Sequence, residues 1–249
     1  MSTSWTPTSS PSWPKAEAAT PTGVWHWLGR SGFAETARLQ ERLRGLIQAG
    51  QAPETLLLLE HDPVITLGRS AEQTNVLHSE AALADRGISV HRASRGGDVT
   101  YHGPGQLVGY PIVRLRGGVR AHVEAMAFAL ADVLSDLGVV AHYRREAPGL
   151  WVGASGRQAK ICAFGVNVHR RITMHGFALN LDPDLEAFKL IVPCGLLGCN
   201  VTSVRALLGS APGPGELSAR VAEALGARLG IAFARRDALS ELQYSEAGP

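Results

Sequence analysis

The chain has 249 residues, of which 45% are hydrophobic, and its formal net charge is +2. This composition is that of an ordinary globular protein that is long enough to bury a sizeable core. A charge so close to neutral gives no indication of a nucleic-acid partner, and no apolar run approaches the roughly 18 residues of a membrane span. Three scattered cysteines are a poor disulfide framework, so we expect a reducing cytoplasm as the location.

The two ends of the chain differ in composition from its middle. Residues 1–23 are rich in Ser, Thr and Pro and contain no long apolar segment, which argues against a secretory signal. We expect them to form a disordered tail, and residues 241–249 to form a second loose tail. Residues 24–240 contain no linker-like stretch and therefore predict a single domain.

The first half of this domain alternates between helical and extended patterns. Leucines at helical spacing predict a helix over Phe33–Gln48. The apolar runs Leu56–Leu59 and Val64–Leu67 predict two buried strands around a Pro-containing turn. A short helix is expected over Ser79–Arg86, with the serine as its N-cap. Arg95–Gln106 contains four glycines and predicts a loop.

The second half continues with a strand at Leu107–Val113 and a strongly periodic helix over Val123–Leu137, which Gly138 ends. Three consecutive strands, one capped short helix and a final helix follow, at Leu150–Val152, Lys160–Val168, Ile172–Leu181, Ser203–Leu208 and Leu217–Leu229. The expected turns are Gly153–Gly156 and Arg170–Arg171. This order of elements predicts an α/β fold of the α+β type, with a mixed sheet and packed helices rather than a regular βαβ repeat.

The segment Arg95–Gln106, with the sequence RGGDVTYHGPGQ, is the first candidate site. Its glycines let the backbone approach a ligand closely, and exposed N–H groups there can bind a carbonyl oxygen or an anion. The segment matches neither a dinucleotide fingerprint nor a P-loop. From these residues alone, a ligand-binding loop and a structurally demanding turn are both open.

Lys160 is the second candidate, because it is a lone charge in an otherwise apolar strand pattern. Such a lysine either reaches solvent from an edge strand or has a buried role, in which burial would lower its pKa and make it a better base. His175 is polar in a similar setting, and a hydrogen-bonded core histidine is the simpler interpretation of that residue. No Cys and His spacing indicates zinc, so we expect no metal site.

Cys194 is the third candidate and lies between Pro193 and Gly195, which predicts a sharp bend. A thiol becomes a nucleophile only as the thiolate, which needs a cation or a helix N-terminus close by. Without such a neighbour it is an inert buried residue, which is the role we expect for Cys162.

The order of four motifs is more specific than any one of them. They are R-G-G-x-x-T-Y-H-G-P-G-Q, A-K-I-x-A-x-G, T-x-H-G-x-A-L-N and P-C-G, in that order along the chain. Together they resemble the lipoyl(octanoyl) transferases, the octanoyl-carrier-protein:protein octanoyltransferases of lipoate synthesis, from about Val24 to Val204.

This resemblance implies the catalytic-domain fold of biotin and lipoate protein ligases, which is similar to the core of class II aminoacyl-tRNA synthetases. It implies Cys194 as the acyl-thioester nucleophile and Lys160, 34 positions earlier, as the residue that activates it. The substrate pocket is then expected to be lined by Arg95, Gly96, Gly97, Asp98, Val99, Thr100, Tyr101, His102, Ala163, Phe164, Gly165, Gly176, Phe177 and Ala178. Phe164 departs from the branched aliphatic residue expected there, which bears on the preferred acyl chain length.

The resemblance also implies the reaction, without any cofactor. Octanoyl-acyl carrier protein would donate the acyl group, and a lysine of a lipoyl domain would accept it, in 2-oxoacid dehydrogenase E2 subunits or the glycine cleavage H protein. Two alternatives are an ATP-dependent lipoate or biotin ligase on the same fold and an inactive module that only binds carrier domains. The Pro-Cys-Gly motif argues against the ligase, and the presence of both Lys160 and Cys194 argues against the inactive module.

Overall fold

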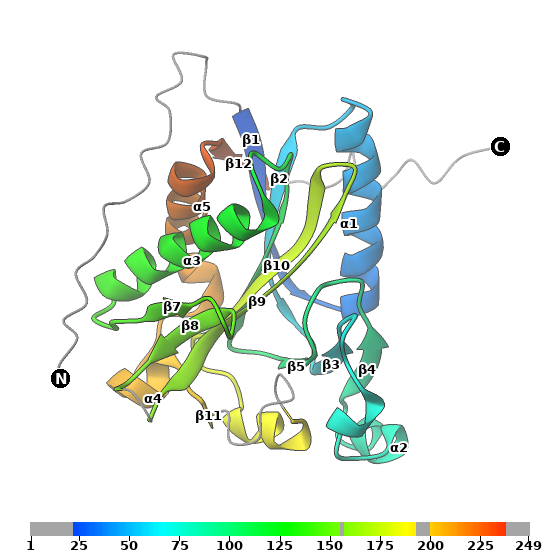
Figure 1. The fold of residues 1–249 in the computed structure, drawn as a ribbon, viewed down its shortest axis with the longest axis vertical. Helices are drawn as coiled ribbons and strands as arrows, with labels where there is room; N and C mark the ends of the chain where they lie inside the picture. The colour runs from blue at the N-terminus through cyan, green and yellow to red at the C-terminus, as the bar shows by residue number, and fades with distance from the viewer. Residues whose placement is uncertain (1–21, 155–156, 193–199, 238–249) are drawn as a thin grey trace.

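A computed structural model describes residues 22–154, 157–192 and 200–237, which form a large mixed sheet, a small sheet and helices on both faces of the large one (Figure 1). Most of the two expected tails, 1–23 and 241–249, lies outside these ranges. Thr22 and Gly23 belong to the first strand, so this strand includes two residues that we expected to lie in the N-terminal tail. No helix in the described ranges is long and apolar enough to cross a membrane.

The large sheet has the strand order β12-β1-β2-β6-β10-β9-β8-β7, and β11 pairs with β9 outside this path. Its strands are β1 (Thr22–Ser31), β2 (Glu54–His61), β6 (Gln106–Ile112), β7 (His142–Arg144), β8 (Gly149–Val152), β9 (Ala159–His169), β10 (Ile172–Asn180), β11 (Asn200–Val201) and β12 (Ala232–Arg235). Strand β1 is parallel to β2 and β12, and β11 is parallel to β9, whereas the other pairs are antiparallel. The predicted mixed sheet is therefore confirmed.

Helix α1 (Phe33–Gln48) lies on one face of this sheet, and helices α3 (Val119–Asp136) and α5 (Pro214–Leu229) lie on the other (Figure 1). Helix α1 has the predicted bounds, whereas α3 begins four residues before the expected Val123. The shorter elements are α2 (Glu80–Ala84), α4 (Val204–Leu208) and the 3-10 turns η1 (Gln73–Asn75) and η2 (Leu185–Leu190).

Two predicted side-chain caps and one predicted corner can be located in the structure. The Ser79 hydroxyl accepts from the amide of Ala82 in α2, and the Ser203 hydroxyl accepts from the amide of Ala206 in α4, so both serines are N-caps. Arg170 and Arg171 both adopt positive φ, as the turn of a tight hairpin between β9 and β10 requires.

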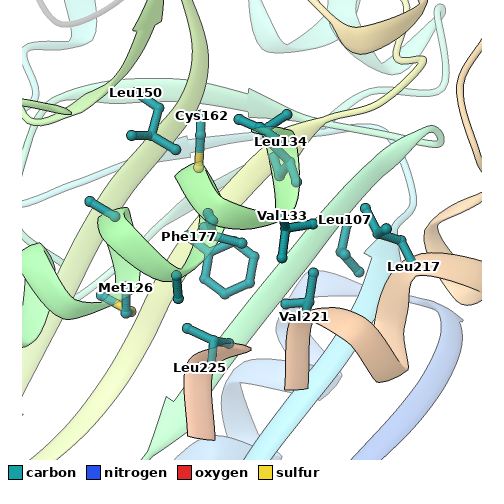
Figure 2. Close-up of a cluster of buried hydrophobic side chains, with 14 of the residues drawn as sticks. Leu107, Met126, Val133, Leu134, Leu150, Cys162, Phe177, Leu217, Val221 and Leu225 are labelled. Carbon is teal, nitrogen blue, oxygen red and sulfur yellow. The ribbon is translucent and has the colours of Figure 1, made fainter. Parts of the chain in front are cut away.

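Strand β2 shows why its apolar run is continuous. Leu56 and Leu58 join the core beneath α3 and α5, while Leu57 and Leu59 join the core beneath α1. A strand that is covered on both faces needs no polar alternation. The core beneath α3 and α5 also contains Cys162, which is fully buried as predicted (Figure 2). Burial raises the pKa of this thiol.

A close approach between β6 and β10 depends on a glycine. Gly109 pairs with Phe177, and a Cβ at position 109 would lie 2.2 Å from the Phe177 ring. The ring fills the space that a side chain would otherwise take and continues into the core beneath α3 and α5 (Figure 2). The pair therefore depends on one residue having no side chain and the other having a large one.

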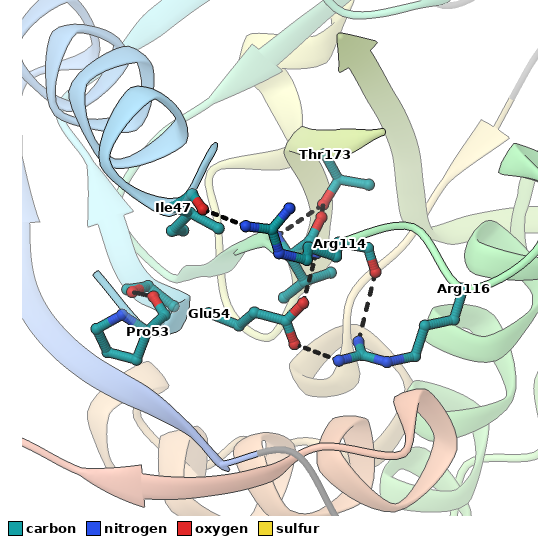
Figure 3. Close-up of polar contacts among 8 residues, drawn as sticks. Ile47, Pro53, Glu54, Arg114, Arg116 and Thr173 are labelled. Carbon is teal, nitrogen blue, oxygen red and sulfur yellow. Dashed lines mark hydrogen bonds and ion pairs between the residues drawn. The ribbon is translucent and has the colours of Figure 1, made fainter. Parts of the chain in front are cut away.

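The buried carboxylate of Glu54 fixes the beginning of β2. Glu54 accepts from the Arg114 amide at 2.7 Å and forms an ion pair with Arg116 at 2.6 Å (Figure 3). The Arg114 guanidinium donates to the carbonyl of Ile47 in the last turn of α1 at 2.5 Å. Because a helix C-terminus presents unpaired carbonyls, this contact ties α1 to the sheet.

The small sheet has the order β4-β3-β5, with β3 (Val64–Leu67), β4 (Ser89–Arg92) and β5 (Val99–His102). The prediction of a loop throughout Arg95–Gln106 is therefore wrong, because Val99–His102 pairs with β3. The glycines flank this strand and hide it from a pattern analysis. Gly105 then turns the chain into β6 with φ +84°, where a Cβ would lie 2.1 Å from the Asp182 carbonyl oxygen.

Candidate functional site

A pocket lies where the small sheet meets β6, β9 and β10 of the large sheet. Its walls bring together Lys160 and most of the residues that the sequence analysis assigned to substrate binding, namely Arg95, Gly97, Asp98, Val99, Thr100, His102, Ala163, Phe164, Gly165, Gly176, Phe177 and Ala178. Residues from the first, second and third motifs of the resemblance thus meet at one place.

Two of the predicted residues do not line this pocket. Tyr101 points into the core of the small sheet, where its ring packs edge-on against Phe188 at a centroid distance of 5.5 Å. Gly96 contributes its amide to the Val166 carbonyl of β9 at 2.9 Å. It therefore ties the glycine-rich segment to the large sheet from behind the pocket wall.

Lys160 lies in the interior of the large sheet, so the alternative of an edge-strand lysine is wrong. Strand β9 is paired with β8, β10 and β11, and only 7% of Lys160 is exposed. Its Nζ lies 4.9 Å from the centroid of the Trp151 ring, which is a cation–π distance. Gly149 leaves room for the lysine stem, because a Cβ there would lie 2.9 Å from Lys160 Cε.

Cys194 and Cys199 lie outside the described residues, so the predicted role of Cys194 as the nucleophile stays a prediction. The chain on either side of them belongs to the pocket, since Phe188 and Val201 both line it. The Val192 amide donates to the Asn75 carbonyl at 2.8 Å, and Asn200 pairs with Ala159, next to the lysine.

Arg95 uses both ends of its guanidinium to fix the wall of the pocket. Nη1 donates to the carbonyls of Gly96 and Asp98 at 3.1 and 2.8 Å. Nη2 donates to the carbonyl and the hydroxyl of Thr66 in β3, both at 2.7 Å. Because the planar group satisfies four acceptors at once, Arg95 joins the glycine-rich segment to the small sheet.

Two buried histidines, His102 and His175, line the pocket, and a third, His61, contacts the pocket residue Tyr110. His61 Nδ1 contacts the Ser31 carbonyl at 2.9 Å, so it carries the proton, and Nε2 accepts from the hydroxyl of Tyr110 at 2.7 Å. Desolvation by burial lowers the pKa of His61 to about 4. His102, on β5, is also buried, and desolvation holds its pKa well below the usual value.

His175 combines a structural and a pocket-lining position. It is 3% exposed with φ +58°, and its backbone amide donates to the Gln40 side chain of α1 at 2.8 Å. Its Nε2 contacts the Ser94 hydroxyl at 3.1 Å, as expected for a hydrogen-bonded core histidine. Desolvation, followed by the charge of Arg95, lowers its pKa to about 4.

Several residues that line the pocket were not among those predicted to bind substrate, namely Phe33, Gln106, Tyr110, Pro148, His175, Asn180, Phe188 and Val201. Gln106, His175 and Asn180 lie inside the motifs that carry the resemblance, so those motifs were the signal that could have placed them in the pocket. Phe33 and Tyr110 follow ordinary helix and strand patterns and gave none.

The sequence matches the family model described as the lipoyl protein ligase A/B catalytic domain over residues 33–226. One curated relative, an octanoyltransferase of Acidobacterium capsulatum, is 48% identical over 189 residues, which cover 71% of this chain and 77% of the relative. An octanoyltransferase of Chloroflexus aurantiacus is 44% identical over 213 residues, which cover 84% of this chain and 93% of the relative.

Two solved structures are similar to this chain with a TM-score of 0.67. One is a bipartite lipoate protein ligase from Thermoplasma acidophilum, at 15% identity and with 89% of each chain covered. The other is a lipoate-protein ligase A bound with ATP, at 14% identity and with 88% of this chain and 90% of that chain covered. At such identities the likeness concerns the fold alone, and it confirms the predicted lipoate-ligase catalytic fold.

Proposed function

This chain belongs to the octanoyltransferases of the lipoyl protein ligase A/B catalytic-domain family, and we propose that it moves an octanoyl group from acyl carrier protein to a lysine of a lipoyl domain. Acyl transfer follows from the family. Beyond the family, we propose the identity of the donor, the identity of the acceptor and a reaction that passes through a covalent acyl-cysteine. The observation that carries it is the buried Lys160 in the wall of a pocket that also contains the small and apolar residues Ala163 and Ala178.

The pocket supports recognition of an acyl chain. Ala163, Phe164 and Ala178 present apolar surface, and Gly165 and Gly176 line the pocket beside them without a side chain of their own. Each methylene buried there would contribute about 0.8 kcal/mol, so chain length is sensed, although only modestly per carbon.

In the first step, the Cys194 thiolate attacks the thioester carbonyl of the donor. The new C–S bond forms as the carrier's C–S bond breaks, and the carrier thiolate leaves and takes a proton. Lys160 would accept the proton of the Cys194 thiol or hold the thiolate as an ion pair. The nearby chain supports this pairing, because Val201 lies opposite Lys160 in the β11–β9 register and Asn200 follows directly after the segment that contains the cysteine.

In the second step, the amine of the acceptor lysine attacks the acyl-cysteine. The product is an octanoyl amide, and Lys160 accepts the proton that the amine loses and passes it to the departing Cys194 thiolate, which regenerates the thiol. A thioester is converted to a more stable amide, so no ATP is required. Because the carrier leaves before the acceptor binds, the scheme predicts ping-pong kinetics.

The acyl-enzyme can be tested directly by mass spectrometry of the protein incubated with octanoyl-acyl carrier protein. We expect one added octanoyl group, its absence in Cys194→Ser and its retention in the matched control Cys199→Ser. Lys160→Ala should stay folded but slow acylation by orders of magnitude. Undiminished acylation of Cys194→Ser would rule out this nucleophile.

The same assay separates the two rival functions. An ATP-dependent ligase would modify the lipoyl domain from free octanoate, ATP and magnesium and would tolerate Cys194→Ser. An inactive binding module would hold carrier domains tightly and transfer nothing. The octanoyltransferase proposal predicts neither result.

A further inference from the structure

A chain of buried hydrogen bonds starts at Arg95 and crosses from the small sheet to the large one. Arg95 Nη2 donates to the Thr66 hydroxyl at 2.7 Å, and that hydroxyl lies 3.4 Å from His102 Nε2. His102 Nδ1 lies 3.1 Å from Gln106 Oε1. Thr66 and His102 belong to β3 and β5, whereas Gln106 opens β6.

The chain continues through the large sheet to the strand beside Lys160. Gln106 Nε2 donates to Asn180 Oδ1 at 3.0 Å, and Asn180 Nδ2 donates to the Thr202 carbonyl at 2.9 Å. The amide of the same Thr202 donates to the Lys160 carbonyl at 3.0 Å. The bond from Asn180 therefore fixes Thr202, whose own backbone amide is bonded to the backbone of Lys160.

The two ends of this chain give it a single direction. A guanidinium only donates and a carbonyl oxygen only accepts, so with a neutral ring at His102 each member between Arg95 and Thr202 accepts from the previous one and donates to the next. The Thr66 hydroxyl must then donate to His102 Nε2, and the only proton of a neutral His102 must sit on Nδ1. A reversed amide at Gln106 or Asn180 would place two acceptors or two donors face to face.

The surroundings of His102 suit a neutral ring. The side chains that face it are His61 from β2, Arg95 from the glycine-rich segment, His175 from β10 and the neutral Thr66 and Gln106. No carboxylate is among these contacts, and the nearby arginine charge disfavours an imidazolium.

We propose that His102 is a positioning residue, which, as a neutral ring protonated on Nδ1, donates to Gln106 and so fixes Gln106, Asn180 and Thr202, and thereby holds β11 against Lys160. The proposal rests on the function proposed above for Lys160. Both ring nitrogens of His102 are occupied within the chain, one as an acceptor and one as a donor. His102 therefore does not exchange protons with the substrate while the chain is intact.

The protonation state can be measured independently of activity. In protein labelled with ¹⁵N-histidine, two-dimensional NMR should show His102 as the neutral Nδ1–H tautomer from pH 5.5 to 8.5, with the His102→Asn spectrum providing the assignment. The Asn180→Leu variant should shift the amide resonances of Thr202 and Lys160. A His102 ring that is protonated on Nε2, or that titrates within this range, overturns the proposal whether or not the protein transfers octanoate.

The positioning role is tested by two amides at position 102. Asparagine places an N–H where Nδ1 stood and can still donate to Gln106, whereas glutamine places its amide toward Thr66 and leaves the Gln106 oxygen without its donor. We expect His102→Asn to lower the octanoyl-transfer kcat by less than about fivefold, and His102→Gln to lower it by roughly tenfold to a hundredfold. KM for the donor should change little in both.

The outcomes separate this inference from the proposed function. If the wild-type protein forms no acyl-enzyme, the function proposed for Lys160 is refuted. The tautomer of His102 measured by NMR then tests the hydrogen-bond chain by itself. If wild-type protein is active and the two amides lose kcat equally, with a flattened pH profile, His102 transfers protons and the positioning role is refuted. Equal loss with equal loss of thermal stability would also refute it, because His102 would then serve the fold in general.

Discussion

Replacing Arg95 with lysine keeps the charge but removes the planar group. The guanidinium fits between two glycines, because a Cβ at Gly68 would lie 2.7 Å from Nη1 and a Cβ at Gly165 would lie 2.9 Å from Cδ. A single ammonium cannot occupy both Nη positions, so either the two Thr66 acceptors or the carbonyls of Gly96 and Asp98 lose their donor.

The loss of these hydrogen bonds lowers the stability of the folded protein. Arg95 is only 9% exposed, so two acceptors would be left in a largely dry region. Hydrogen bonds from charged donors contribute about 1.5–3 kcal/mol each, and partial access to water reduces the sum, so we expect Arg95→Lys to lower the free energy of unfolding by about 2–4 kcal/mol. In a domain of this size the melting temperature should fall by roughly 5–15 °C.

Urea unfolding followed by circular dichroism measures this difference, and Arg92→Lys provides the matched control. Arg92 is exposed on β4, where the same substitution should change stability by less than about 0.5 kcal/mol. If Arg95→Lys and Arg92→Lys unfold at the same urea concentration, the four-acceptor geometry of Arg95 contributes nothing to stability and the reasoning is refuted.

Two further predictions concern pH and chain length. Desolvation lowers the pKa of His122 to about 4, so the unfolded chain binds a proton that the folded chain rejects, and stability falls as the pH drops from about 6.5 toward 4. His122→Leu should reduce this slope by up to about 1.4 kcal/mol per pH unit, measured by urea unfolding at pH 7 and 5. The matched control is His142→Leu, because His142 is exposed and its loss should leave the slope as it is. If His122→Leu and His142→Leu give the same slope, the prediction is contradicted. Phe164→Leu should enlarge the pocket and raise the decanoyl-to-octanoyl ratio of kcat/KM by up to about fifteenfold, since two methylenes contribute about 1.6 kcal/mol. A constant ratio would mean that Phe164 does not limit chain length.

Periodic and apolar patterns were sufficient for most of the framework. Helix α1 has the expected bounds because apolar residues recur along it at helical spacing and Gly50 lies just beyond its end, and Leu56–Leu59 was correctly predicted as a buried strand. Strand β1 was missed because Thr22–Ser31 mixes buried and half-buried residues without alternation. The edge strands Ser89–Arg92 and Ala232–Arg235 were missed because they are short and largely exposed.

The pocket was predictable only in part, for a physical reason. The ordered motifs identified Lys160 and the glycine-rich segment, but the residue physics of the lysine alone favoured a solvated edge. Its burial depends on pairing of β9 with three strands, which no local pattern records. The bond between Gln106 and Asn180 joins positions 74 residues apart, and its direction depends on Arg95 and Thr202 at the two ends of the chain.

The contact between Gly109 and Phe177 restricts which substitutions the sequence can tolerate at these two positions. A methyl group at 109 has no room while the aromatic ring is present, and the loss of the ring alone leaves a cavity beneath α3 and α5. Each single change is therefore harmful, although the combination of a side chain at 109 with a smaller residue at 177 restores the filled volume. The two positions form an epistatic pair, and a library randomised at both should return side-chain sizes that vary inversely.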